Sequence, residues 1–175
     1  MDMNELTHQE IIRLLNLEPL VGEGGLFRQT YKSNVTIPKS QLSSGYSADR
    51  AIATQIYYLL TDDANSFSAL HRLLSDEVYH FYLGDPVEML LLYENGITEV
   101  IQLGSDILRG QHVQFLVPGQ VWQGAYLKPG GKFALLGTSV IPGFELEDFE
   151  LGIREELIKE YEDQRIIIEK LTRPQ

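Results

Sequence analysis

The sequence contains no cysteine, few basic residues and no long hydrophobic run, and each absence excludes a class of protein. Without cysteine the chain has no disulfide, zinc-thiolate site or thiol nucleophile. The 14 Lys and Arg residues are outnumbered by 25 Asp and Glu residues, and the net charge of -11 repels phosphate backbones. The longest apolar runs, such as QIYYLL and VEMLLLY, are too short to span a membrane. We therefore expect neither a nucleic-acid partner nor a membrane partner.

The first ten residues, MDMNELTHQE, are acidic and polar, unlike the basic and apolar start of a signal peptide. Together with the lack of cysteine, this start favours a cytoplasmic location. The 175 residues fit one domain of ordinary size, which we place over residues 1–175. The chain contains no GxGxxG, P-loop, nucleophile-elbow or HExxH motif.

A succession of short strand patterns, separated by turn signals, fills the middle of the chain. We expect strands at 26–32, 52–60, 66–73, 77–83, 87–93, 97–103, 111–117, 121–128 and 132–140. The Asn95-Gly96 pair between two apolar strands is the strongest hairpin signal. Many short strands with short turns favour a sandwich or a barrel.

Helices are expected only at the two ends. Residues 7–15 form an amphipathic segment that begins with a T-x-x-E capping box, and residues 154–164 form the second helical segment. Residues 35–50 are polar and predict an exposed loop, whereas residues 141–150 are expected to leave the sheet. The sequence thus predicts an all-β fold, an antiparallel jelly-roll β-sandwich barrel with short N- and C-terminal helices.

Side chains two positions apart on a strand share a face, and this alternation brings a few polar groups to the barrel interior. Glu77 and Tyr79 share a face that we place inside the barrel, and His71 points inward from the preceding strand. Gln114 and Gln123 are expected to point inward from two later strands. A few polar groups in an apolar, aromatic cup are typical of a small-molecule site.

Two motifs in the same region resemble those of the cupin superfamily. Cupins carry G-x5-H-x-H-x3/4-E-x6-G followed by G-x5-P-x-G-x2-H-x3-N. Here His71, Glu77 and Gly84 keep the first spacing, with Leu73 at the place of the second histidine. In the second motif Gln123 stands at the histidine position.

The resemblance extends over nearly the whole chain. It is carried by GGLFRQTY, TQIYYLL, SALHRLLSDEVYHFYLGDP, VPGQVWQGA and VIPGFELEDFEL. Within VPGQVWQGA, Gln120 replaces the motif glycine. The chain resembles in particular one cupin family of unknown function, and it is distantly similar to rhamnose-type sugar-nucleotide epimerases. This resemblance implies a cupin-type jelly roll with its pocket at the motif residues.

The usual cupin metal site has three histidines and one glutamate, and this chain keeps only part of that set. His71 and Glu77 remain, Leu73 has no donor atom, and the neutral amide oxygen of Gln123 is a poor ligand for a transition metal. We therefore expect no required cofactor. Under the alternative of a metal-dependent, oxygenase-like cupin, His71, Glu77 and Gln123 are the candidate ligands of a divalent metal.

The favoured alternative is proton transfer of the epimerase or isomerase type. In the epimerases that the chain distantly resembles, a pocket histidine removes a proton next to a carbonyl and a tyrosine returns one. The resemblance implies His71 as this base, with Glu77 orienting it. No motif assigns the tyrosine, for which four candidates stay open: Tyr57, Tyr58, Tyr79 and Tyr126.

Further residues are candidates for holding a small-molecule ligand. Gln114 and Gln123 would bind ligand oxygens, with Tyr79 beside them. Arg28 lies on a strand that could reach the barrel mouth, where a guanidinium would bind a carboxylate by two parallel bonds. The expected ligand is thus sugar-like or carboxylated. A non-catalytic ligand-binding or structural cupin is the remaining alternative.

The outer surface of the barrel carries aromatic side chains. Alternation places His80 and Tyr82 on the face opposite Glu77, and Trp122 on the face opposite Gln123. Cupins commonly pair through sheet faces, so the resemblance and these side chains together predict a homodimer.

Overall fold

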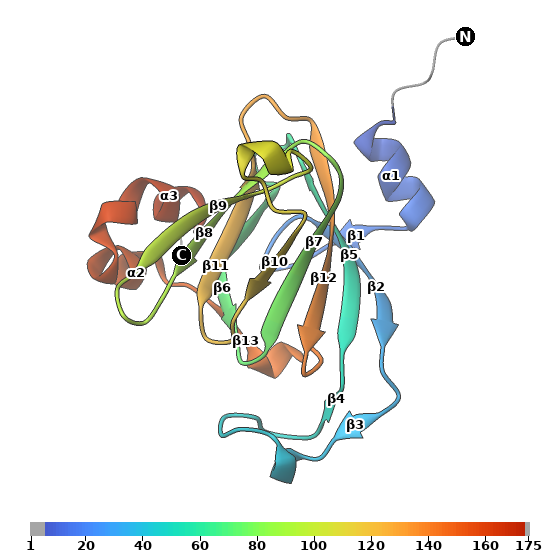
Figure 1. Ribbon diagram of the computed structural model, residues 1–175, viewed down its shortest axis with the longest axis vertical. Helices are drawn as coiled ribbons and strands as arrows, with labels where there is room; N and C mark the ends of the chain where they lie inside the picture. Colours follow the sequence, from blue (N-terminus) through green and yellow to red (C-terminus); the bar gives the residue numbers. More distant parts are fainter. Residues whose placement is uncertain (1–5, 174–175) are drawn as a thin grey trace.

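The computed structural model describes residues 6–173, in which two antiparallel sheets pack face to face (Figure 1). The six-stranded sheet contains, in spatial order, β1 (Glu18–Pro19), β2 (Leu26–Lys32), β5 (Thr54–Thr61), β12 (Phe133–Ile141), β7 (Asp76–Gly84) and β10 (Gln114–Val117). The five-stranded sheet contains β13 (Phe149–Leu151), β6 (Phe67–Leu73), β11 (Trp122–Leu127), β8 (Val87–Leu92) and β9 (Thr98–Leu103). This arrangement is the jelly-roll sandwich that the strand pattern predicts.

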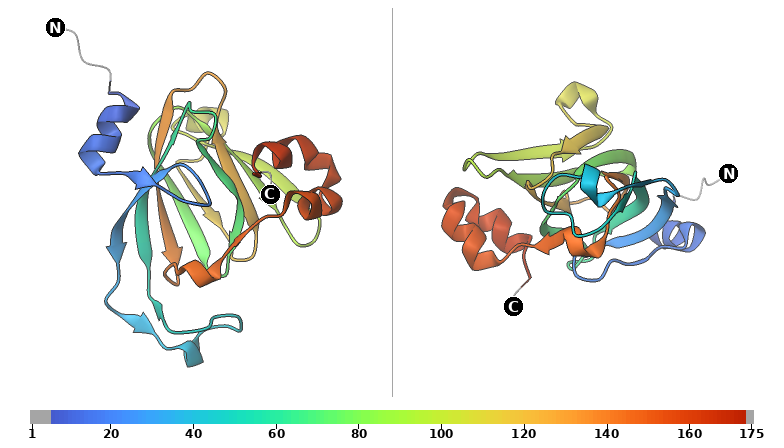
Figure 2. Two further views of the ribbon diagram at one scale, coloured as in Figure 1. Left: turned by 180° about the vertical axis from the view of Figure 1, so that it is seen from behind. Right: turned by 90° about the horizontal axis from the view of Figure 1, so that it is seen from below.

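Short helices cover part of the outer face of each sheet. Helix α1 (His8–Leu15) lies beside β1 and β5, whereas α2 (Arg154–Glu160) and α3 (Arg165–Lys170) lie on the side of β8 and β9 (Figures 1 and 2). The predicted capping box is present at the start of α1. Single 3-10 turns occupy Lys39–Gln41, Ile107–Arg109, Leu146–Asp148 and Glu162–Gln164. Within residues 6–173, no helix is long and apolar enough to cross a lipid bilayer.

The apolar residues divide into three clusters because each sheet buries both of its faces in part. On β5, Tyr58 and Leu60 point between the sheets, while Leu59 points outward to pack beneath α1. On the other sheet, Leu70 and Leu90 face outward and pack against α2 and α3. The alternation of side chains along each strand therefore supplies one shared core and two outer clusters.

All nine predicted strands form, and three segments differ from expectation. In the predicted exposed loop, β3 (Thr36–Ile37) pairs with β4 (Arg50–Ala51), and Tyr46 is buried. The segment expected to leave the sheet does leave the six-stranded sheet, but its end joins the five-stranded sheet, where β13 pairs with β6. The C-terminal helical segment continues beyond 164 as α3, because its apolar residues cover Leu70 and Leu90.

The two cupin-like motifs meet at the corner between β6 and β7. There the chain crosses from the five-stranded to the six-stranded sheet within two residues. The Gly119 amide donates to Asp76 Oδ1 at 2.9 Å, and the Gln120 amide donates to the Leu73 carbonyl at 2.8 Å. A Cβ at position 119 would collide with the carbonyl of Leu74, so only glycine allows this close approach. The corner therefore fixes how the motif residues face one another.

Candidate functional site

A cavity of about 160 Å³ opens between the two sheets. Both sheets contribute to its wall, together with the loop between β1 and β2 and the segment that follows β12. Its lining residues are Leu20, Val21, Glu23, Phe27, Gln29, Thr54, Ile56, His71, Leu73, Glu77, Thr138, Val140, Phe144, Leu146 and Phe149. The wall is therefore mainly apolar, with the ionisable groups Glu23, His71 and Glu77.

His71 is held in one orientation on β6. Its Nδ1 lies 2.8 Å from the carbonyl oxygen of Ala69, which can only accept, so Nδ1 carries a hydrogen. Its Nε2 lies 3.8 Å from Glu77 Oε2, a distance too long for a hydrogen bond but short enough for an ion pair. The ring stacks on Phe149, with 5.2 Å between centroids. Both ring nitrogens thus face oxygen acceptors.

Glu77 and Gln123 face each other across the two sheets. Gln123 Nε2 donates to Glu77 Oε2 at 2.9 Å, and both side chains are buried. The alternation predicted an inward position for each, and the structure places each inside the barrel. Gln123 Oε1 is buried and has no hydrogen-bond partner among the described residues. A buried acceptor of this kind needs a water or ligand donor.

Glu23 is the ionisable cavity residue that the sequence reasoning missed. The loop between β1 and β2 docks on β6, where the Ala69 amide donates to the Glu23 carbonyl at 2.9 Å and Ser68 Oγ donates to Glu23 Oε1 at 2.7 Å. Gly24, at φ 110°, lets the backbone approach β6 closely, since a Cβ there would meet the carbonyl of Phe67. An acidic residue flanked by glycines in GEGG was the available signal.

The charges of the cavity are coupled. Burial alone lowers the pKa of His71, but the attraction of Glu23 and Glu77 and the contact with Ala69 outweigh it and raise that pKa to about 9. Loss of hydration raises the pKa of Glu23, although the charge on His71 opposes this effect. At neutral pH His71 is therefore an imidazolium, and Glu23 holds a proton more tightly than an ordinary carboxylate.

The segment after β12 covers one side of the cavity with Phe144 and Phe149. It is fastened by Arg50, which is only 1% exposed and donates to both carboxylate oxygens of Asp148, at 2.6 and 2.7 Å. Arg50 also donates to Glu147 at 2.7 Å. The predicted loop at 35–50 is thus an anchor for the cavity wall.

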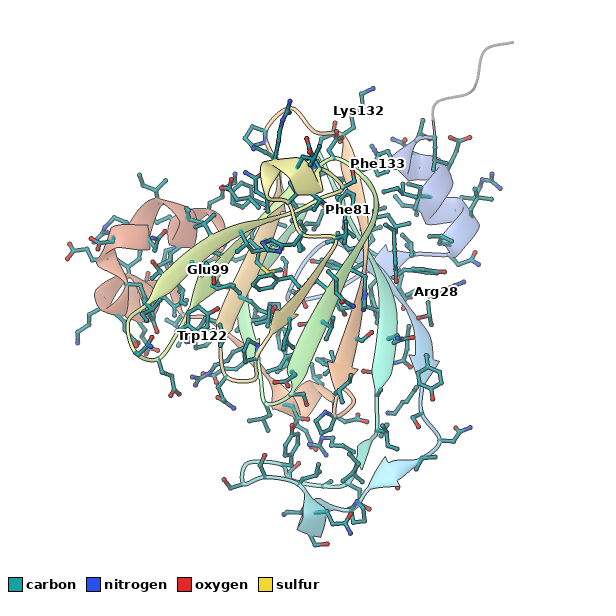
Figure 3. The ribbon with its side chains drawn as sticks, viewed as in Figure 1. Arg28, Phe81, Glu99, Trp122, Lys132 and Phe133 are labelled. Atoms are coloured by element: carbon teal, nitrogen blue, oxygen red, sulfur yellow. The ribbon has the colours of Figure 1, made fainter. Side chains whose placement is uncertain are left out.

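Gln123 is not among the residues that line the cavity, and two further predicted ligand-binding residues lie on the outer face of the six-stranded sheet. Gln114 is exposed on the outer face of β10, and its Nε2 lies 3.3 Å from His80 Nδ1, because Phe115 takes the inward position. Arg28 stacks over the ring of Tyr57 at 5.5 Å on the outer face, at the β2 edge shown in Figure 3. The expected inward position of Gln114 and the expected mouth position of Arg28 are both wrong.

The tyrosines stand away from the cavity wall as well. Tyr79 is buried in the core, where burial and the nearby Glu77 raise its pKa well above the usual value. Tyr58 is buried beside the loop and donates to the Gly24 carbonyl at 3.0 Å. Tyr57 and Tyr126 lie on outer faces, the latter beneath the C-terminal helices. None of the four tyrosine candidates lines the cavity.

The donors around His71 do not fit the usual cupin metal set. Leu73 occupies the cavity wall at the second histidine position, and Gln123 directs its amide nitrogen, not its oxygen, toward Glu77. Within residues 6–173, His, Asp and Glu side chains form no group of three or more that could hold a metal ion. A tight transition-metal site needs more nitrogen or carboxylate donors than this arrangement directs to one point.

Residues 9–152 match the sequence profile described as Cupin superfamily (DUF985). The chain belongs to the cupin superfamily. Its predicted relation to a cupin family of unknown function and its cupin-type fold are thereby confirmed.

Relatives of this cupin occur in distant organisms. An X-ray structure of a Shewanella oneidensis protein is 33% identical, with a TM-score of 0.85 over 98% of this chain and 100% of that one. A hypothetical protein from Leishmania major is 26% identical, with a TM-score of 0.85 over 97% and 100% of the two chains. An uncharacterised protein of Saccharomyces cerevisiae is 30% identical over 134 residues, which span 72% of this cupin and 66% of the yeast chain.

Proposed function

We propose that the cavity of this cupin binds a small organic molecule and that His71 exchanges a proton with it in an isomerase-like reaction. The orientation of His71 carries the proposal, since Nδ1 is fixed by Ala69 and Nε2 faces Glu77 without a hydrogen bond. A proton on Nε2 is therefore held by charge attraction and is free to bond to a ligand oxygen.

The charge state of His71 decides the direction of its first proton transfer. The carboxylates of Glu23 and Glu77 raise the pKa of His71 to about 9, against burial, so the ring carries two protons at neutral pH. The group that acts first is then a proton donor and not the base that the distant epimerase resemblance implies. A ligand oxygen at Nε2 would receive this proton.

Neither the predicted carboxylated ligand nor the metal-dependent alternative is part of this proposal. The carboxylated ligand depended on Arg28, which lies on the outer face, so we do not retain it. A metal-dependent reaction is disfavoured because Leu73 and the amide nitrogen of Gln123 stand where donors are needed. Elemental analysis that found stoichiometric iron, manganese, nickel or zinc in protein purified without chelators would restore that alternative.

Deuterium exchange at carbon tests the proton-transfer proposal without knowledge of the natural substrate. Wild-type protein and His71→Asn would be incubated in D₂O with three probes of different chemistry: cyclopentanone, levulinate and dihydroxyacetone. NMR would follow the loss of the protons next to each carbonyl. We expect at least one probe to exchange faster with wild type than with His71→Asn. If no probe shows exchange that depends on His71, the proposal of proton transfer is refuted for these probes. A probe that raises the melting temperature of the protein without exchanging its protons would instead indicate a non-catalytic ligand-binding cupin.

A homodimer through the outer face of the six-stranded sheet is a second proposal, supported by a row of directly paired residues. The row runs across five strands and consists of Arg28, Tyr57, Gly137, His80 and Gln114. The cytoplasmic location likewise stays a prediction.

Tyr82 gives this outer face its apolar centre. The ring is 51% exposed, stacks parallel to His80 and meets Tyr57 edge to face. Trp122 (Figure 3), which the sequence grouped with this face, lies elsewhere and packs against the cluster beneath α2 and α3. The guanidinium of Arg72 lies over its ring. The proposed dimer surface therefore excludes Trp122.

A further inference from the structure

The size of the cavity limits its ligand to a small molecule. Its volume of about 160 Å³ is close to that of an engineered cavity of about 150 Å³ that holds benzene. A ligand of roughly six to eight non-hydrogen atoms therefore fits inside. A nucleotide-linked sugar is several times larger and would leave most of its atoms outside.

The charge of the wall selects against anions. Glu23 and Glu77 supply two carboxylates, His71 is the single basic group, and no lysine or arginine belongs to the described lining residues. A carboxylate or phosphate on the ligand would meet two like charges and only one opposite charge, all of them in surroundings that screen charge poorly. The charges of the wall therefore disfavour an anionic ligand.

The remaining wall favours an apolar body with one polar atom. Leucine, isoleucine, valine and phenylalanine side chains make up most of the lining, including Leu73 at the place of a metal ligand. His71 Nε2 is the charged hydrogen-bond donor on this wall, since Ala69 occupies Nδ1, and it stands beside the neutral donors of Gln29, Thr54 and Thr138. A carbonyl oxygen matches that donor, since it accepts hydrogen bonds and carries no charge.

Glu23 supplies the second group that a carbonyl compound needs. Its carboxylate lines the same cavity as His71, and Ser68 Oγ holds one of its oxygens at 2.7 Å. Glu77, in contrast, is engaged by Gln123 and His71. Glu23 is therefore the carboxylate that is placed to take a proton from the ligand.

We propose, on the basis of the proposed function above, that the substrate is a small uncharged aldehyde or ketone, with Glu23 as the base and His71 as the acid. Glu23 takes a proton from the carbon next to the carbonyl, and the C–H electron pair becomes a carbon–carbon double bond. The carbonyl π electrons move to oxygen, which takes the proton from His71 Nε2. The products are an enol, a protonated Glu23 and a neutral imidazole, and the reverse steps return a proton to carbon.

The ionisation of the two groups suits these roles. Loss of hydration raises the pKa of Glu23, which makes its carboxylate a stronger base than an ordinary one. Nearby carboxylates, against the effect of burial, raise the pKa of His71 to about 9, which keeps the acid protonated at neutral pH. The exchange rate should therefore rise with pH as Glu23 ionises and fall again near pH 9.

Deuterium exchange with matched probes and variants tests this assignment. Cyclopentanone is small and uncharged, whereas levulinate carries a carboxylate beside a similar ketone. We expect wild type to exchange cyclopentanone at least tenfold faster, relative to the uncatalysed reaction, than levulinate. Glu23→Gln should lower the enzymatic rate at least 100-fold, Glu23→Asp should retain part of it, and Glu18→Gln, an exposed neighbour on β1, should leave it unchanged.

The outcomes separate this inference from the proposed function. Exchange that depends on His71 but survives in Glu23→Gln, or that favours levulinate, would overturn the substrate class and the base while keeping His71 in its role. Exchange that depends on neither residue would overturn both. Because the Glu23 backbone carbonyl holds the loop on β6, the Gln variant keeps that bond, and circular dichroism would check its fold. Should Glu23→Gln unfold, an enzymatic rate for Glu23→Asp equal to that of wild type at every pH would overturn the base assignment.

Discussion

At the scale of single residues, His71 shows how position sets ionisation. An isolated buried imidazole would be neutral, since burial disfavours charge. Here Ala69 and Glu77 present oxygen atoms to the two ring nitrogens, and a neutral ring could donate to only one of them. The attraction of Glu23 and the extra proton that resolves this mismatch together raise the pKa of His71 to about 9 despite burial.

This shift predicts how stability depends on pH. Because the folded-state pKa of about 9 exceeds the ordinary value of 6.5, His71 stabilises the fold fully below pH 6.5 and loses this contribution as pH rises through 9. The difference corresponds to about 3 kcal/mol. Urea unfolding between pH 6 and 9.5 should show wild type losing more stability than His71→Asn. A control variant at an exposed histidine, His112→Asn, should follow wild type; a His71→Asn variant that also follows wild type would contradict the prediction.

Gln120 has a backbone conformation that residues other than glycine rarely adopt. Gln120 adopts φ 70°, in the left-handed region, at the place where the second cupin motif has glycine. A residue with a Cβ is strained there by about 1 kcal/mol. Gln120→Gly should therefore stabilise the protein by about 1 kcal/mol in chemical denaturation. Gln102→Gly, inside β9, serves as the opposite control and should destabilise it; a loss of stability in both variants would argue against strain at 120.

At the scale of elements, the segment after β12 depends on a buried ion pair with a distant loop. Asp148 accepts two hydrogen bonds from Arg50, and the neighbouring charges raise the pKa of that guanidinium further. Removing one partner leaves a buried charge poorly compensated. The cavity wall formed by Phe144 and Phe149 is therefore stabilised from outside the cavity.

Asp148→Asn tests this anchoring. We expect a loss of about 3 kcal/mol in the free energy of unfolding, the lower part of the range for a broken buried pair, because Glu147 still contacts Arg50. Glu147→Gln changes the half-exposed partner and should shift the unfolding midpoint little. If both substitutions lowered the free energy of unfolding equally, the burial of Asp148 would not be what makes its ion pair with Arg50 important for stability.

The elements also show where sequence reasoning succeeds. Period-two alternation located all nine predicted strands and placed Glu77 and Gln123 inside the barrel. It failed at Gln114, since β10 is short and lies at a sheet edge, where alternation alone does not tell which face is inward. It also passed over Glu23, because a glycine-rich loop has no periodicity from which a direction could be read.

At the scale of the whole molecule, part of the outer face of the six-stranded sheet is left uncovered by residues 6–173. Helix α1 covers only the end of the six-stranded sheet that carries Leu59 and Leu135, and the C-terminal helices cover the other sheet. Exposed Tyr82 and Leu116 lie on the uncovered part. Flat sheet faces of this kind suit a twofold interface, in which the same patch serves both subunits.

Tyr82→Glu tests this proposed dimer. A carboxylate at the centre of the interface would meet its symmetry mate and lose hydration, so the variant should be monomeric. Light scattering after size exclusion should give the chain mass of 19.9 kDa for Tyr82→Glu and twice that mass for wild type. Leu108→Glu, at a fully exposed position, is the matched control and should remain dimeric. A monomeric wild type would refute the proposal.

Because the chain crosses from one sheet to the other between β6 and β7, the site residues lie on both sheets and connect them. His71 and Gln123 belong to one sheet and Glu77 to the other, so their contacts join the two layers. Any molecule that takes a proton from His71 or supplies one to Glu77 alters the attraction between these two side chains, and so the interaction between the two sheets. The melting temperature is therefore a reporter of site chemistry, and a compound library could be screened by heat alone, before any reaction is known.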